Sequence, residues 1–271
     1  MAESVRGSRS FVASVGAKTL TFVSFVGGVS LLMRDAVACV VLGPFRGRPV
    51  RARDFFAQAV RVGPNSLSIV FLVNFFVGLI LALIGGNILV KLGFTRYIGD
   101  LMSVGVVLEL GPLLTGIIMT GYIGAAFAAE IGTMVVSEET TAMQTMALSP
   151  VRYIVAPRVM ATVLMIPCVT LLGDMFGILG GLLVSTGVLG LSPQTYFEQA
   201  WGRLSSNDVW RGLFKAAVFG TIIGSVGCDM GFRVKGGAEG VGRATTRAVV
   251  WSIIAIIVSD AILNYLLLFR L

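Results

Sequence analysis

Long apolar runs separated by short polar stretches dominate the chain. Residues 62–90 and 110–129 carry no formal charge. At about 1.5 Å per helical residue, runs of this kind can cross the roughly 30 Å hydrocarbon core of a bilayer. The pattern predicts an all-α integral membrane protein with five spans, at about residues 65–88, 101–129, 152–189, 211–232 and 248–269. The polar stretches 91–100 and 190–210 would then be outer loops, and 231–247 would return to the inner side.

The N-terminal segment is apolar but too interrupted to span. Within residues 11–45, Lys18 and the pair Arg34-Asp35 leave uncharged runs of only about fifteen and ten residues. We expect this part to lie in the membrane interface, as one amphipathic helix or as two half-penetrating helices. A basic cluster follows and should face anionic headgroups on the cytoplasmic side: Arg46, Arg48, Arg51, Arg53 and Arg61. We therefore divide the chain into an interfacial segment, 1–61, and a five-span domain, 62–271.

A short polar helix is expected between the second and third spans, over residues 137–148. Ser137 is a candidate N-cap with Glu138 and Glu139 in the first turn, and Pro150 should end the helix. A helix this short cannot cross a bilayer, so it must lie on the membrane surface. Met143 and Met146 fall near one face at the helical period. That face either packs on the rest of the protein or docks into a groove of a soluble partner.

Composition supports the membrane assignment, since 56% of the 271 residues are hydrophobic and only 13% are charged. The net charge of +7 would also suit a nucleic-acid binder, but basic residues placed this unevenly arise equally from membrane topology, and we expect no nucleic acid. An inside N-terminus places most basic residues on the inner side. The loops between spans carry equal numbers on both sides, so the orientation rests on the N-terminal segment.

Several kinds of site are disfavoured by the residue types present. The sequence contains no histidine, and Cys39, Cys168 and Cys228 are far apart among apolar residues, so neither a metal site nor a disulfide framework is indicated. The stretch 237–244 has the outer glycine spacing of a phosphate loop but lacks its Lys-Ser/Thr pair. We expect no cofactor on this chain and no catalytic activity. Uphill transport would need a gradient or another subunit.

Glycines recur at four-residue spacing in two of the expected spans. The third span carries Gly173, Gly177 and Gly181, and the fourth carries Gly220 with Gly224, followed by Gly227 with Gly231. Small residues at this spacing let helix backbones approach closely in a membrane. The pattern predicts a tight bundle and leaves open whether the contacts lie within one chain or between two subunits.

Three carboxylates lie in or near apolar spans: Glu109, Asp174 and Asp260. A charge is costly there, so each is a candidate for a functional role facing a cavity or a partner. Each also fits a carboxylate that is neutral or paired inside the bundle. A gradient-driven carrier would need such acids, so their presence alone does not distinguish mechanisms.

Motifs along most of the chain resemble the MlaE/YrbE permease family. They occur in order from about residue 60 to 265: Glu109-Leu110-Gly111-Pro112; Gly121 and Gly124, followed by Ala129-Glu130-Ile131-Gly132 and Met134; Glu138-Glu139; Met146-Ala147 and Pro150; Pro157-Arg158; Pro167; and the C-terminal signature Gly240-Val241-Gly242-Arg243-Ala244-Thr245-Thr246-Arg247-Ala248-Val249-Val250. A single four-residue motif would be weak, whereas this ordered set is specific.

The resemblance implies the permease subunit of an ABC-type lipid transporter, which we expect in a bacterial inner membrane with a cytoplasmic N-terminus. Such a subunit acts as a homodimer with two copies of a cytoplasmic ATPase, which binds ATP and Mg. It works with a periplasmic protein carrying the mammalian-cell-entry (MCE) domain and, in some systems, with a STAS-domain subunit. The system moves phospholipid between inner and outer membranes and maintains outer-membrane lipid asymmetry. Chloroplast inner envelopes house relatives, but the N-terminus shows no evident transit peptide.

The resemblance also assigns roles to particular residues. A coupling helix, about residues 133–148, would seat Glu138, Glu139, Met143 and Met146 on the ATPase. Leu81, Leu89, Leu92 and Glu109 match positions that line the family's lipid pocket. Leu108 and Tyr122 stand where the family often has arginine, which implies a changed headgroup contact. The alternatives are a gradient-driven carrier that uses Glu109, Asp174 and Asp260, and a scaffold that only anchors an MCE-domain partner.

Overall fold

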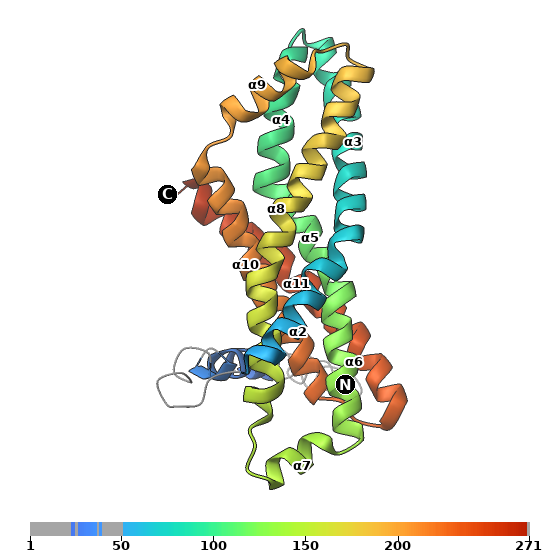
Figure 1. Ribbon diagram of the computed structural model, residues 1–271, viewed down its shortest axis with the longest axis vertical. Helices are drawn as coiled ribbons and strands as arrows, with labels where there is room; N and C mark the ends of the chain where they lie inside the picture. The colour runs from blue at the N-terminus through green and yellow to red at the C-terminus, as the bar shows by residue number, and fades with distance from the viewer. Residues whose placement is uncertain (1–22, 25–26, 37, 40–50, 270–271) are drawn as a thin grey trace, which may run out of the picture.

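The computed structural model describes residues 23–24, 27–36, 38–39 and 51–269. Within these residues the chain is helical and contains no strand. Figure 1 shows an elongated bundle with the short helix α9 (Pro193–Arg203) at one end and α7 (Glu139–Thr145) at the other. We refer to these as the α9 end and the α7 end.

Five helical stretches of the described chain are long and apolar enough to span a membrane, which confirms the prediction. The first comprises α2 (Ala52–Val62), the turn η1 (Pro64–Ser66) and α3 (Leu67–Lys91). After η2 (Thr95–Tyr97), the second comprises α4 (Ile98–Gly105), η3 (Val106–Leu110), α5 (Gly111–Met119), η4 (Thr120–Gly124) and α6 (Ala125–Val136). The others are η5 (Val151–Val155) with α8 (Ala156–Gly187), α10 (Ser206–Phe232) and α11 (Gly237–Phe269).

Local sequence explains two boundaries that the hydropathy pattern did not place. The stretch 190–210, expected as a loop, contains α9, whose Ser192 hydroxyl accepts a hydrogen bond from the Thr195 backbone N–H at 3.1 Å. The fourth span begins at Ser206 instead of about 211, because Ser205 and Asp208 form a capping box at its start. The early start moves Lys215 from the expected end of the span into its third turn.

The glycine repeats pack helices together within this one chain. A Cβ on Gly78 of α3 would overlap the backbone of Gly177 on α8, and one on Gly220 of α10 would lie 2.5 Å from the carbonyl oxygen of Thr162 on α8. Backbones can approach this closely only where the side chain is a hydrogen atom. At these positions the glycines therefore make contacts within one chain, which was one of the two possibilities that the sequence left open.

Helix α10 is the centre of the bundle, since 67% of its most apolar stretch is buried, against 22% for α3 and 17% for α11. The outward faces of α3 and α11 carry large apolar side chains, among them Leu72, Ile84, Ile257 and Tyr265. In a bilayer such faces meet lipid or another membrane subunit.

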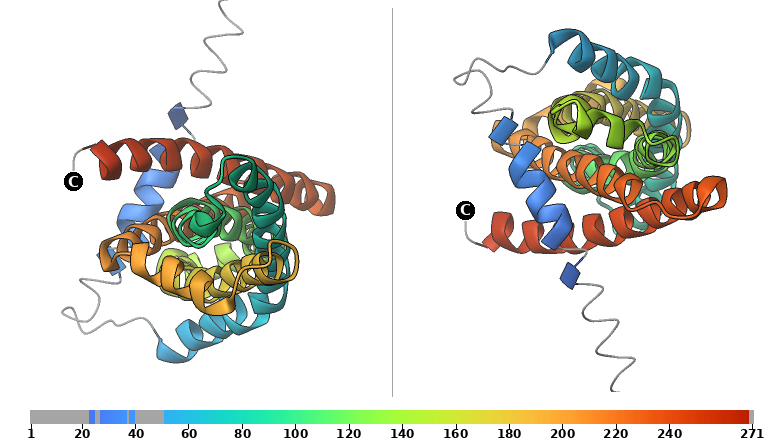
Figure 2. Two further views of the ribbon diagram at one scale, coloured as in Figure 1. Left: turned by 90° about the horizontal axis from the view of Figure 1, so that it is seen from above. Right: turned by 90° about the horizontal axis from the view of Figure 1, so that it is seen from below.

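Only part of the expected interfacial segment 11–45 belongs to the described residues. Its helical residues 27–36 lie against the bundle near the α7 end (Figure 2). Val29 packs on a small core cluster from α6, α10 and α11, and the Arg233 guanidinium donates to the Ser24 carbonyl oxygen at 3.1 Å. Of the expected basic cluster, Arg46 and Arg48 lie outside the described residues.

Candidate functional site

The second span is broken where Glu109 sits, and the break follows from sequence. Residues Val106–Leu110 form a π-helix turn, in which the Gly111 N–H bonds to the Val106 carbonyl five residues earlier. Pro112 has no N–H, so the Leu108 carbonyl lacks its usual helical donor. Single π turns inside α-helices are frequent at functional sites. This one presents a free carbonyl and a carboxylate to the neighbouring helices.

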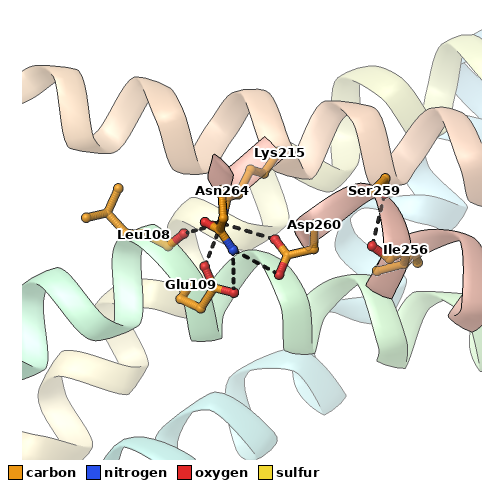
Figure 3. A network of polar contacts seen from close by, with 7 residues as sticks. All are labelled: Leu108, Glu109, Lys215, Ile256, Ser259, Asp260 and Asn264. Atoms are coloured by element: carbon orange, nitrogen blue, oxygen red, sulfur yellow. Dashed lines mark hydrogen bonds and ion pairs between the residues drawn. The ribbon is translucent and has the colours of Figure 1, made fainter. Parts of the chain in front are cut away.

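Lys215 of α10 reaches this break. Its Nζ lies 2.6 Å from Glu109 Oε2, 3.1 Å from the Leu108 carbonyl oxygen, 2.6 Å from Asn264 Oδ1 and 3.1 Å from Asp260 Oδ1 (Figure 3). The ammonium group can donate three hydrogen bonds and has no acceptor capacity. Its side chain is only 2% exposed, and the surrounding oxygens replace the water that it gives up.

Asn264 completes a network between three spans. Its Nδ2 donates to Glu109 Oε1 at 3.0 Å and to Asp260 Oδ2 at 3.3 Å. Asp260 and Asn264 share one face of α11, four residues apart. Glu109, Lys215, Asp260 and Asn264 are called the polar cluster below. Two carboxylates and one ammonium are tolerated among apolar helices because each is paired and hydrogen-bonded.

The polar cluster is closed on one side and open on the other. The side chain of Glu109 is 38% exposed, whereas those of Asp260 and Lys215 are 9% and 2% exposed. A polar group of a ligand would therefore meet Glu109 first. The buried ammonium of Lys215 lies behind that carboxylate and fixes its orientation.

The expected lipid-binding leucines lie at different distances from Glu109. A Cβ on Gly105, one helical turn before Glu109, would lie 3.9 Å from Leu81 Cδ2. Leu89 is eight residues farther along α3, a rise of about 12 Å, where it is half-buried near the α9 end. Leu92 is 62% exposed. The structure thus places Leu81 beside Gly105, one helical turn from Glu109, and a lipid-binding role for all four residues stays a prediction.

Sequence reasoning missed Lys215 and Asn264 as members of the site. The charge count that sets the orientation treats Lys215 as an outer basic residue, although the expected fourth span, from about residue 211, would include it. The available signal was a single lysine a few residues inside an apolar run, which is expected to face a partner. For Asn264, the signal was an amide four residues after Asp260 on one helix face.

The two positions where the family often has arginine contribute in different ways. Leu108 joins the polar cluster through its backbone carbonyl, while its side chain points away (Figure 3). Tyr122, in the second π turn, is 40% exposed, and its hydroxyl donates to the Asn65 carbonyl oxygen at 3.4 Å.

A second ionic group lies toward the α7 end and joins two of the sequence motifs. Glu130, from Ala129-Glu130-Ile131-Gly132, accepts from Arg61 of α2 through one carboxylate oxygen and from Arg158 of α8 through the other, the latter at 2.9 Å. Arg158 is 7% exposed, donates to the Ile154 carbonyl oxygen at 3.0 Å and lies over the Phe127 ring. We call Arg61, Glu130 and Arg158 the carboxylate clamp. We call residues 137–150, which contain α7, the α7 loop. The clamp ties α2, α6 and α8 together, with Glu130 shortly before this loop and Arg158 shortly after it.

The α7 loop differs in detail from the expected helix. Ser137 is the C-cap of α6 and its hydroxyl donates to the Thr133 carbonyl oxygen, so its assignment as an N-cap is wrong. The N-cap is Glu138 with φ 61°, and the helix covers only Glu139–Thr145. Met146 is its C-cap, and Pro150 stands before the next helical turn instead of ending this one.

The expected methionine face of this helix is divided between core and solvent. Met143 packs against the main hydrophobic core and Thr140 is buried beside it. Met146 is 63% exposed, and Glu138 and Glu139 are exposed as well. One side of the helix therefore packs on its own protein, and the other leaves Glu138, Glu139 and Met146 available to a partner.

Comparison with known proteins matches nearly the whole chain. The model of the family described as Permease MlaE matches residues 55–266. A probable ABC transporter permease protein of Rickettsia felis is 37% identical over 258 residues, which cover 93% of this chain and 96% of that protein. Protein TRIGALACTOSYLDIACYLGLYCEROL 1, chloroplastic, of Arabidopsis thaliana is 36% identical over 83% of this chain and 64% of its own length.

A further relative carries a functional name. The intermembrane phospholipid transport system permease protein MlaE of Haemophilus influenzae is 29% identical over 94% of this chain and 96% of its own length. With the five spans, the ordered motifs and the family match over residues 55–266, the chain belongs to the MlaE family of ABC transporter permeases.

Proposed function

We propose that this chain is the permease subunit of an ATP-driven transporter that moves phospholipid between the inner and outer membranes of a bacterium and maintains outer-membrane lipid asymmetry. The observation that carries the proposal is the polar cluster: a half-exposed carboxylate, Glu109, backed by buried Lys215, inside an otherwise apolar bundle. A lipid needs both environments, an apolar surface for its acyl chains and a polar point for its headgroup.

In this proposal the lipid lies along α3 and the second span. Its acyl chains contact Leu81, Leu89 and Leu92, and its headgroup meets Glu109. Glu109 is held in place by Lys215 at 2.6 Å and by Asn264 at 3.0 Å. Because Lys215 and Asn264 lie on α10 and α11, a tilt of either helix would move the headgroup contact.

The α7 loop is the proposed input for ATP hydrolysis. Glu138, Glu139 and Met146 present an exposed surface beyond the end of the bundle (Figure 1). A cytoplasmic ATPase subunit that binds ATP and Mg would push on this surface. The carboxylate clamp joins both arms of the loop to α2, so a push on α7 would be transmitted to the first, second and third spans together.

Orientation and partners complete the proposal. We propose that the α7 end and the N-terminus face the cytoplasm of a bacterial inner membrane. Once Lys215 is assigned to the polar cluster, the basic residues between spans are more numerous toward the α7 end, which supports this orientation. The apolar outward faces of α3 and α11 suit a homodimer interface and a periplasmic MCE-domain partner. A STAS-domain subunit would join from the cytoplasmic side in systems that have one.

The gradient-driven alternative gains no support from the contacts. Glu109 and Asp260 share the ammonium of Lys215, which ties up two of the three acids such a carrier would use. Asp174 takes no part in that network. A scaffold that only anchors an MCE-domain partner would need neither the polar cluster nor the exposed surface of α7.

A pull-down of the tagged protein from its native membrane in mild detergent tests the proposal, with mass spectrometry of bound proteins and lipids. The expected result is an ATPase, an MCE-domain protein and phospholipid in one complex. Recovery of the chain alone, with flux after reconstitution that depends on a proton gradient, would overturn it. The double variant Glu139→Arg/Met146→Arg distinguishes a transporter from a scaffold. A scaffold would still anchor its MCE-domain partner without the ATPase, so its function would be unchanged in this variant.

A further inference from the structure

Asp174 is a buried acid without a polar partner among the described residues. It lies in the middle of α8, is 4% exposed, forms no ion pair, and its Oδ1 has no hydrogen-bond partner. Asp229 of α10 is almost equally buried, at 5%, but its carboxylate lies 2.7 Å from the Arg233 guanidinium. Both aspartates are buried, but only Asp229 has a positively charged side chain beside its carboxylate.

The space that Asp174 occupies is created by Gly111. Helix α8 runs antiparallel to the second span, so that Gly181 faces Met102 and Gly177 faces Val106. One turn on, a Cβ added to Gly111 would overlap Asp174 Oδ1, and it would also lie 3.0 Å from the Val106 carbonyl oxygen. A carboxyl oxygen and a backbone carbonyl oxygen therefore flank the same point. Both are acceptors unless the carboxyl carries a proton.

The positively charged side chains on the helices around Asp174 either pair with other acids or lie toward the ends of α8. Helix α5 contains no charged residue. On α10, Lys215 is paired with Glu109 of η3 inside the polar cluster, and Arg211 lies 4.0 Å from Asp208. On α3, the Asn74 amide lies beside the neighbouring Gly173 and donates to the Val70 carbonyl oxygen. The remaining charged residues of α8 and of the helices packed against it lie toward one end or the other of α8: Arg53, Asp54, Arg61, Arg152, Arg158 and Asp229 toward the α7 end, and Lys91, Asp100, Glu198 and Arg203 toward the α9 end.

We propose that Asp174 is a proton-binding site, held as the neutral acid, whose O–H donates to the carbonyl oxygen of Val106 in η3. An ionised carboxylate here would face an acceptor in an apolar interior without a cation, which costs far more than binding a proton. The π turn that carries Glu109 therefore packs on α8 only while Asp174 keeps its proton. This site lies outside the polar cluster and does not rest on the proposed transport function.

Infrared spectroscopy and thermal unfolding of the full-length protein in lipid nanodiscs test the proposal, with Asp229→Asn as the matched control. At neutral pH the wild type should show a carboxylic-acid C=O band that shifts in D₂O, is lost in Asp174→Asn and persists in Asp229→Asn. Asparagine keeps a donor and adds no charge, so Asp174→Asn should unfold at the wild-type temperature. Asp229→Asn, which leaves Arg233 without its carboxylate, should unfold at a lower one.

Two results would overturn the assignment. One is loss of a carboxylate band, instead of an acid band, in Asp174→Asn. The other is a drop in unfolding temperature as large as that of Asp229→Asn. If Asp174→Asn does not accumulate, protein labelled with ¹³C at its aspartate carboxyls decides. A labelled acid band that persists in Asp260→Asn supports the site, whereas its absence, or its loss in Asp260→Asn, refutes it.

Discussion

The ammonium of Lys215 lies 2.6 Å from a carboxylate oxygen of Glu109, a residue 106 positions earlier in the chain. This contact joins the second and fourth spans at the point where the second span is broken by a π turn and Pro112. Asn264 adds the fifth span to the same group. The centre of the bundle is therefore held by polar contacts, and the helices around it are held by close glycine packing.

Replacing Lys215 by methionine should destabilise the protein by about 3 kcal/mol, because removal of one partner leaves buried charge unpaired. Asp260, whose side chain is 9% exposed, bears most of that cost. The double variant Lys215→Met/Asp260→Asn should recover part of the stability. Thermal unfolding in detergent measures both, and a Lys215→Met protein as stable as the wild type would contradict the role of the pair.

Replacing Glu130 by glutamine should loosen the α7 loop. The change leaves the Arg158 guanidinium, 7% exposed, without its carboxylate, and we expect a loss of about 2 kcal/mol with faster hydrogen exchange in α6 and α7. The matched control is Glu239→Gln, which removes an exposed pair with Arg243 and should change stability by less than about 1 kcal/mol. Equal effects of the two substitutions would argue against a clamp.

Replacing Gly180 by alanine should impair folding, because a Cβ there would overlap the Phe75 carbonyl oxygen on α3 and backbone cannot move aside cheaply. Gly242 provides the control, since a Cβ at that helical position meets no atom within 4 Å. Alanine there should stabilise the helix by up to about 1 kcal/mol. Yield of monodisperse protein and its unfolding temperature distinguish the two, and similar outcomes would refute the close packing of α3 on α8.

Hydropathy was sufficient for the five spans, because uncharged runs long enough to cross a bilayer have few alternatives. It also singled out Glu109 and Asp260, since acids in apolar runs need partners. It did not reveal Lys215, which lies close enough to Arg211 and the preceding polar loop to be taken for an outer residue. The π turns also leave no mark on hydropathy, because they change hydrogen bonding without changing polarity. Hydropathy also does not show which side of α7 packs on the protein, because packing of Met143 depends on residues distant in sequence.

Removing the hydroxyl of Tyr196 should cost about 1 kcal/mol and change the alkaline stability. The hydroxyl is buried and donates to the Ile178 carbonyl oxygen at 2.9 Å. Burial raises the pKa of Tyr196 above its ordinary value. An acid with a raised folded-state pKa contributes stability that is complete below about pH 10, the unfolded value, and is lost as the pH rises further. Tyr196→Phe should therefore lose less stability above pH 10 than the wild type, and parallel pH curves would contradict this.

Substituting arginine at both Glu139 and Met146 should abolish copurification of an ATPase while the permease stays folded in the membrane. Both side chains are exposed, so the substitutions change the surface of α7 and not its packing. Met143 is the informative contrast, because it packs against the core, and Met143→Arg should lower the unfolding temperature whether or not a partner is present. If the Glu139/Met146 variant retains its ATPase at the wild-type ratio, the exposed side of α7 is not the contact. The ATPase would then have to contact another part of the permease.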